Sequence, residues 1–176
     1  MTATDRKCPI DLLEHWVRTH PQSVYLRQPE HGEIREIDSE GYLQITGRVK
    51  DIFKTGKGKY VAPVPIESLV FEDEHVEQVC VVGSGLPQPV ALVVLSNETT
   101  DGVPEHEIQQ SLSRSLNRAN AQLEKPEQLG RIFVVSDEWT VENEFLTPTM
   151  KIKRDLIEEK YETVVAAPAD SKVVFL

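Results

Sequence analysis

The chain has 176 residues, enough to bury one hydrophobic core with a peripheral segment. Hydrophobic residues make up 39% and charged residues 27%, fractions that are typical of soluble globular proteins. The formal net charge of -10 argues against nonspecific binding to DNA or RNA, which needs a positive surface, and against electrostatic docking on anionic lipid.

We expect neither export nor membrane insertion. Residues 1–7 are polar with no apolar signal-peptide core after them, and no apolar run approaches the roughly 20 residues of a spanning helix. Cys8 and Cys80 lack metal-ligand spacing, and the apolar run around Cys80 predicts a buried structural thiol. A reducing cytoplasm is the expected location.

The first part of the chain predicts a short helix followed by strands. Residues 10–20 place apolar side chains on one helical face, and Pro21 ends the pattern. The sequence then predicts three strands separated by turn signals, over residues 24–28, 33–37 and 42–49.

The remainder predicts a sheet with helices. Residues 65–71 form a short helix with proline in its first turn, and the β-branched runs 78–83 and 90–95 read as paired central strands. Residues 105–123 carry one apolar helical face. A further buried strand follows over 131–135.

A final helix over residues 150–161 completes the order of elements, and the tail from Ala166 is expected to be loosely held. Helices and strands mix without regular alternation. This order predicts an α+β fold, with a small mixed sheet that is covered by helices and preceded by a β-hairpin.

Three basic segments stand out. The charged cluster from Gly47 to Asp51 follows a strand, which is typical of a solvated turn. Residues 54–63 place two glycines among lysines but lack the strand–G-x-x-x-x-G-K-[ST]–helix pattern, so by themselves they predict a flexible surface loop. Residues 148–154 place cations at a predicted helix start, where the dipole disfavours them, and this weakly indicates another purpose.

Together these segments resemble the C-terminal domain of adenylate-forming enzymes, most closely that of the long-chain fatty acyl-CoA synthetases, a family of AMP-forming acid–thiol ligases. The resemblance implies three parts. Residues 1–32 resemble the opening segment of a synthetase, residues 33–165 its C-terminal lid domain, and residues 166–176 form the tail.

The resemblance also implies roles for individual residues. Lys151 matches the lysine that enters the adenylation site, where its charge stabilises the attack of a fatty carboxylate on the α-phosphorus of ATP. Lys50 matches the hinge between the two domains, which must absorb a large φ/ψ change. Arg48 and Asp51 then make domain contacts that differ between the two states.

The glycine–lysine loop matches the loop that swings in for thioester formation with coenzyme A. The residues implied are Gly56, Lys57, Gly58 and Lys59. Gly58 would let the backbone approach the pantetheine chain, because it has no Cβ, and the lysines would meet phosphates.

Other residues near these motifs are interpreted without a role in the reaction. Glu67 is taken as a first-turn acid that the helix dipole favours, and Lys153 and Arg154 as contacts to solvent or to a partner domain. The family's usual glycine before the lysine is Met150 here. The histidines show no ligand or nucleophile pattern and are taken as surface or structural, and no metal site is expected: His15, His20, His31, His75 and His106.

The family's ATP-binding elements are missing from the sequence, which reads like an internally deleted synthetase. The full-length family uses ATP and Mg²⁺ with coenzyme A as substrate, but we expect none of them bound to this chain alone. One lysine cannot position ATP and a carboxylate, so we also expect no independent ligase activity.

Other functions stay open. The chain could be a free-standing interaction module that docks on an adenylating domain in trans or on itself through the helix over 10–20. It could instead bind coenzyme A or acyl-CoA through the loop over 56–59. A complete enzyme formed by oligomerisation is disfavoured, because each copy still lacks the phosphate loop.

Overall fold

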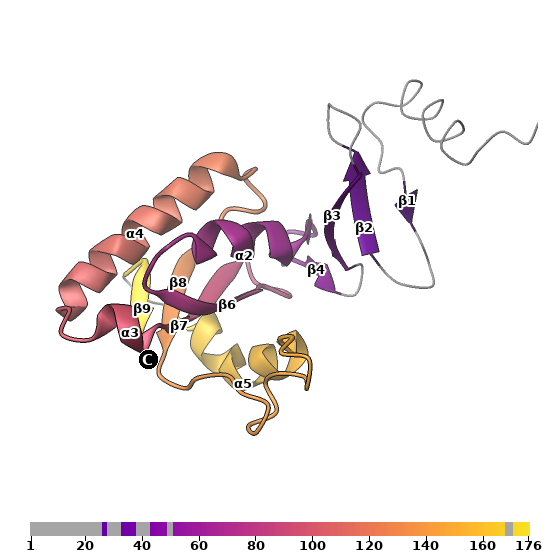
Figure 1. Ribbon diagram of the computed structural model, residues 1–176. Coiled ribbons are helices and arrows are strands. Elements are labelled where there is room, and N and C mark those ends of the chain that lie inside the picture. The colour runs from indigo at the N-terminus through magenta and orange to yellow at the C-terminus, as the bar shows by residue number, and fades with distance from the viewer. Residues whose placement is uncertain (1–25, 28–32, 38–42, 49–50, 168–170) are drawn as a thin grey trace, which may run out of the picture. The chain divides into compact units, whose positions relative to one another are not determined.

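The computed structural model describes residues 26–27, 33–37, 43–48, 51–167 and 171–176 (Figure 1). The chain divides into two compact units, Met1–Lys50 and Asp51–Leu176. The boundary between them lies inside the stretch that the sequence assigns to a single domain over 33–165. The helix predicted over 10–20 lies outside the described residues.

The first unit contains a three-stranded antiparallel sheet in the order β1-β2-β3. Its strands are β1 (Leu26–Arg27), β2 (Glu33–Ile37) and β3 (Leu43–Arg48). An irregularity in register between Ile34 and Arg35 interrupts the pairing of β2 with β3. The hairpin predicted ahead of the main sheet is therefore confirmed.

The second unit is built on a four-stranded mixed sheet in the order β6-β7-β8-β9. Its strands are β6 (Val76–Val82), β7 (Val90–Leu95), β8 (Arg131–Val135) and β9 (Val173–Phe175). β6 pairs with β7 antiparallel, whereas β7 with β8 and β8 with β9 are parallel. The predicted pairing of the two apolar runs is confirmed.

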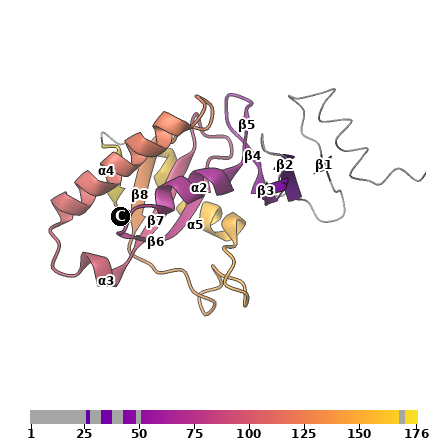
Figure 2. The same cartoon turned by 45° about the horizontal axis from the view of Figure 1, so that its top comes forward.

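Helices cover both faces of this sheet. The helices α2 (Pro63–Phe71) and α4 (Glu105–Gln122) pack on one face and α5 (Arg154–Ala166) on the other (Figure 2). The short α3 (Asn97–Thr100) follows β7, and a hairpin of β4 (Phe53–Lys54) and β5 (Tyr60–Val61) precedes α2. The α+β fold predicted from the sequence is confirmed.

Alternation along β7 explains why its sequence is apolar throughout. Ala91 and Val93 pack into the core under α2 and α4, while Leu92 and Val94 pack into the core under α5. All four side chains are buried because successive residues of a strand point to opposite faces. Cys80 lies in the α5 core and is fully buried, as its surroundings in the sequence predict.

Two elements near the C-terminus differ from the sequence-based expectation. The last helix begins at Arg154 rather than at residue 150, because Met150 has a left-handed backbone (φ 59°) that no right-handed helix accepts. The tail is also more ordered than expected, since β9 adds a parallel strand beside β8 and buries Val173.

A buried carboxylate ties the end of α2 to α4. Asp73 accepts hydrogen bonds from Ser115 Oγ at 2.6 Å, from Ser111 Oγ at 3.1 Å, and from the backbone N–H of His75 at 3.1 Å. The His75 ring nitrogen Nδ1 lies 3.1 Å from the same carboxylate. Burial raises the pKa of Asp73, but the hydrogen bonds from Ser115, His75 and Ser111 outweigh it, so its pKa lies below the ordinary value.

We predict that Asp73→Asn lowers the free energy of unfolding by about 1–3 kcal/mol at pH 7, because the hydroxyls lose a charged acceptor. Since the pKa is depressed in the folded state, this stability is present at neutral pH and is lost as the pH falls below about 4. Urea unfolding at pH 7 and pH 3 measures it, with the neighbouring exposed Glu74→Gln as the control. An Asp73→Asn effect of equal size at both pH values would contradict the assignment.

Candidate functional site: the Lys151 hairpin and its anchor

Lys151 lies in a tight hairpin immediately before α5. The Lys153 N–H donates to the Phe145 carbonyl at 2.8 Å, and the Thr147 N–H donates to the Lys151 carbonyl at 2.8 Å. The Met150 N–H closes the turn by donating to the Thr147 carbonyl, also at 2.8 Å. These backbone bonds define residues 145–153 as a hairpin, called the lysine hairpin below.

Side chains reinforce the turn of the lysine hairpin. Thr147 Oγ1 accepts the Lys151 N–H at 3.1 Å and lies 3.0 Å from Thr149 Oγ1. The Lys151 side chain is exposed, as expected, and it forms no ion pair or side-chain hydrogen bond within the described part of the chain. A rigid turn therefore presents a free ammonium group to the outside.

A buried ion pair anchors the C-terminal end of the lysine hairpin. Arg154, the first residue of α5, donates from its guanidinium to Glu67 Oε1 at 2.6 Å. The side chains are only 13% and 15% exposed. The expectations that Arg154 contacts solvent or another domain and that Glu67 is merely a first-turn acid are therefore wrong: α2 begins at Pro63, and Glu67 lies in its middle.

The same pair closes the free edge of β6. Both backbone groups of Val81 point to that edge: its N–H donates to Glu67 Oε1 at 2.8 Å, and its carbonyl accepts from Arg154 at 2.5 Å. The Arg154 guanidinium also lies 3.3 Å from the Cys80 sulfur, while its Nε is buried and makes no hydrogen bond to the described residues. An edge strand whose polar groups are occupied in this way cannot pair with another strand there.

Charge states at the anchor follow from burial and neighbours. Burial raises the pKa of the Cys80 thiol to about 12 despite the nearby Arg154 charge, so this thiol is neutral. Burial lowers the pKa of Arg154, but the hydrogen bond and the charge of Glu67 help to raise it above its ordinary value, so the guanidinium stays charged.

The glycine–lysine loop forms the turn between β4 and β5. The Gly56 N–H donates to the Leu86 carbonyl at 2.7 Å, and a Cβ at Gly56 would lie 2.5 Å from the Gly85 carbonyl oxygen. Glycine at 56 is therefore required by the close approach of the loop over 83–89. Gly58 has φ +79°, a Cβ placed there would meet only the Lys54 side chain at an ordinary 3.8 Å, and Lys57 is exposed.

The predicted hinge residues lie at the junction of the two units. Arg48 is the last residue of β3, and Asp51 is the first residue of the second unit. Lys50 lies outside the described residues. The helix α2 connects the glycine–lysine loop to the lysine hairpin. It begins just after β5, and it carries Glu67, which binds Arg154 at the end of the hairpin.

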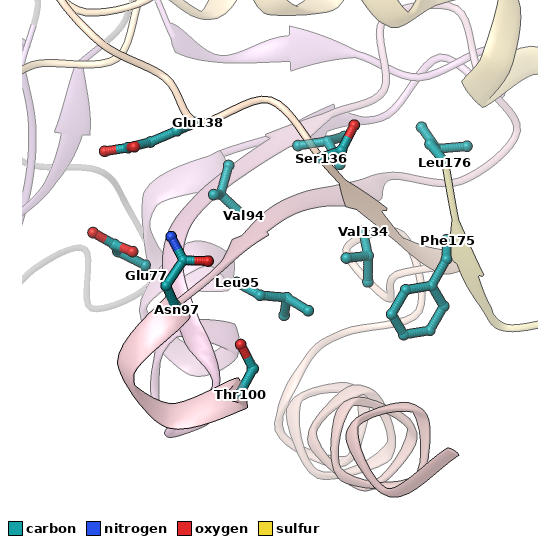
Figure 3. A pocket seen from close by; sticks show the side chains of 11 residues that line it. Glu77, Val94, Leu95, Asn97, Thr100, Val134, Ser136, Glu138, Phe175 and Leu176 are labelled. Carbon is teal, nitrogen blue, oxygen red and sulfur yellow. The ribbon is translucent and has the colours of Figure 1, made fainter. Parts of the chain in front are cut away.

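Two of the cavities in the second unit differ in how they relate to the predicted site. An apolar groove of about 410 Å³ runs between α2, the edge of β6 and the lysine hairpin, and Phe71 and Met150 line it with 55% and 68% of their surfaces exposed. A second cavity of about 290 Å³ lies at the carboxyl ends of β7 and β8 (Figure 3). Leu95 and Phe175 line its apolar part, and none of the predicted site residues contributes to it.

Residues 50–170 match the family described as AMP-binding enzyme C-terminal domain. The chain belongs to this family. It is a C-terminal domain of the kind found in adenylate-forming, fatty acid–CoA ligase-like enzymes, in agreement with the resemblance of its motifs.

Known relatives are much longer than this chain. This chain is 27% identical over 152 residues to the long-chain-fatty-acid–CoA ligase FadD15 of Mycobacterium tuberculosis, and the match covers 77% of this chain and 25% of that protein. It is 32% identical over 148 residues to long-chain-fatty-acid–CoA ligase 6 of Rattus norvegicus, covering 74% and 21%. The chain thus spans about a quarter of the length of these curated relatives.

A solved structure supports the fold. The adenylation domain of a carboxylate reductase from Mycobacterium chelonae superposes with a TM-score of 0.64 at 24% identity, covering 76% of this chain and 22% of that one. Within the described ranges, no cluster of His, Cys, Asp or Glu side chains could hold a metal ion. None of the described helices has the length and apolar character needed to cross a bilayer.

We predict that Met150→Gly raises the free energy of unfolding by about 0.5–1 kcal/mol. A non-glycine residue in the left-handed region costs about 1–2 kcal/mol, which exceeds the entropic cost of glycine. Met150→Ala is the matched control, because it shortens the exposed side chain but keeps the unfavourable φ. Urea denaturation of the three proteins checks this, and equal stabilities of the glycine and alanine variants would contradict it.

Proposed function

We propose that this chain is the lid domain of a long-chain fatty acid–CoA ligase-like system, in which Lys151 serves acyl-adenylate formation on a separate adenylating domain. The observation that carries the proposal is the exposed, unpaired ammonium group at the turn of the lysine hairpin. Family membership supports it, because the motif that carries Lys151 lies within the matching residues.

The chemistry needs a positive charge that arrives from outside. A fatty carboxylate oxygen attacks the α-phosphorus of ATP, a new oxygen–phosphorus bond forms, and pyrophosphate leaves with the electrons of the broken bond. Negative charge spreads over the carboxylate and phosphate oxygens, and an ammonium in a closed site stabilises it. Lys151 supplies that charge without transferring a proton, and its long stem allows insertion and withdrawal.

The second half-reaction assigns a role to the glycine–lysine loop. Gly58 lets the loop approach the pantetheine chain of coenzyme A, and the ammonium groups of Lys57 and Lys59 meet its phosphates. Gly56 serves this loop indirectly, since its N–H is already bonded to Leu86. The turn is held by Thr55, whose N–H donates to the Lys59 carbonyl at 2.8 Å, so the lysines are displayed on a defined scaffold.

A change between the two half-reactions requires a hinge, and we place it at Lys50. The division of the chain between Lys50 and Asp51 supports this placement, because a hinge belongs where one compact unit ends and the next begins. Arg48 and Asp51 flank the hinge and exchange contacts as the lid turns.

ATP, Mg²⁺ and the fatty acid belong to the adenylating domain, so the described domain needs that domain in order to act and is inactive without it. The described residues offer one charge at Lys151 and no cluster that could hold Mg²⁺. An interaction-module function is favoured by the apolar groove beside the lysine hairpin, because Val64, Phe71 and Met150 form an exposed surface that a docked domain would cover.

We predict that the chain releases no pyrophosphate from ATP and palmitate by itself. Mixed with FadD15 ligase that lacks its own C-terminal domain, it should raise pyrophosphate release, and Lys151→Ala should lower that gain about 10²–10³-fold, the usual cost of losing one charge-stabilising group. Lys153→Ala, a lysine two residues away, is the matched control. Activity of these 176 residues alone that Lys151→Ala abolishes would overturn the requirement for an adenylating domain, and a gain insensitive to Lys151→Ala would overturn the role of Lys151.

A further inference from the structure

We propose that Glu67 is a positioning residue for Lys151 and acts through Arg154. The inference rests on the proposed role of Lys151 in adenylation. It assigns a function in the reaction to a carboxylate that lies 84 positions away in the sequence and that forms no hydrogen bond or ion pair with the lysine in the described part of the chain.

The first step of the argument is the lysine hairpin. Its two arms are joined by the bonds from Lys153 to Phe145 and from Thr147 to Lys151, so the hairpin moves as one body. Arg154 follows the second arm directly. Whatever fixes Arg154 therefore fixes the direction in which the hairpin presents Lys151.

The second step is the fixing of Arg154. Its guanidinium reaches two acceptors on different elements, Glu67 Oε1 on α2 and the Val81 carbonyl on β6. Glu67 Oε1 in turn accepts the Val81 N–H. Three groups thus form a closed ring of hydrogen bonds, in which one guanidinium nitrogen of Arg154, Nη1, donates to both Glu67 and the Val81 carbonyl.

The third step is the position of Glu67. α2 begins one residue after β5, so the helix that holds Arg154 also carries the glycine–lysine loop. The loop over 83–89 adds a second link, because Ser84 donates its N–H to Glu158 of α5 at 3.0 Å and Gly85 donates to Lys54 of β4 at 3.0 Å. The surfaces proposed for the two half-reactions are therefore held on one frame, and Glu67 sets the angle between them.

The variant Glu67→Gln tests the proposal with little change in shape. An amide keeps an oxygen for the Val81 N–H but loses the charge that orients Arg154. Glu72→Gln is the matched control, because Glu72 directly follows α2 and forms an exposed ion pair with Arg118 at 3.6 Å. Both variants are made in the full chain.

Amide hydrogen exchange is the first readout. In Glu67→Gln we expect the amides of Thr147 and Lys153 to exchange at least tenfold faster. The exchange rate of the Leu92 amide in β7 should change only as far as the variant changes global stability. Glu72→Gln should leave all three rates unchanged. Equal acceleration at Thr147, Lys153 and Leu92, or none at Thr147 and Lys153, would overturn the proposal, since a merely structural residue affects the whole fold alike.

The second readout is kinetic and uses the mixture with lid-deleted FadD15 ligase. Glu67→Gln should lower kcat about tenfold with little change in KM for ATP, and it should add nothing in the Lys151→Ala background, because it acts only through that lysine. Independent, multiplying losses would overturn the proposal. If Lys151→Ala has no effect, the proposed function fails instead, and the exchange experiment still decides whether Glu67 orients the hairpin.

Discussion

A buried ion pair at the free edge of β6 connects the parts of this domain that matter for function. Removing Glu67 and Arg154 from water costs several kcal/mol per charge, and an apolar pair of similar size often stabilises a protein as well or better. The arrangement is therefore poor evidence for stability. The pair instead restricts where the hairpin can lie, because Nη1 of Arg154 must reach Glu67 on α2 and the Val81 carbonyl on β6 at the same time.

The position of the pair also protects the sheet. β6 is an edge strand with an apolar sequence, and such an edge invites pairing with another chain. Glu67 and Arg154 occupy the outward backbone groups of Val81, and α2 and the lysine hairpin lie on either side. The same two side chains thus cover this part of the strand edge and anchor the end of the lysine hairpin. Loss of either would leave a buried charge without its partner, which is why the two roles cannot be separated by deleting one side chain.

The sheet and the longest helix could be predicted from the sequence because their signals are local. Residues 78–83 and 90–95 are β-branched and apolar, and the 3.6-residue repeat of α4 places Ile108, Leu112 and Leu116 in the core. β9 could not be predicted in this way. It is three residues long, and its partner β8 lies far earlier in the chain, so only tertiary pairing reveals it.

The candidate site was predictable where a short motif carries it and unpredictable where distant residues meet. Lys151 and the glycine–lysine loop each lie in a motif of consecutive residues, so a short stretch of sequence is enough to identify them. The start of α5 was misplaced because helix rules do not reveal that Met150 adopts φ 59°. The contact of Glu67 with Arg154 joins residues 87 positions apart, so no sequence window contains it.

The distribution of charge is consistent with a lid domain that contacts phosphate groups only at two turns. The chain carries a net charge of -10, which repels polyanions over most of its surface. Against this background, Lys57 and Lys59 lie exposed at one turn and Lys151 at another, and the backbone of each turn is fixed by its own hydrogen bonds. Local positive charge on a rigid support gives an anion a defined place to bind, whereas the same lysines spread over an acidic surface would be neutralised by their neighbours. In the function proposed for this domain, two such turns on one frame serve two anionic reactants in sequence by rotation of the whole domain, and the proposed hinge at the junction between the compact units is the place for that rotation.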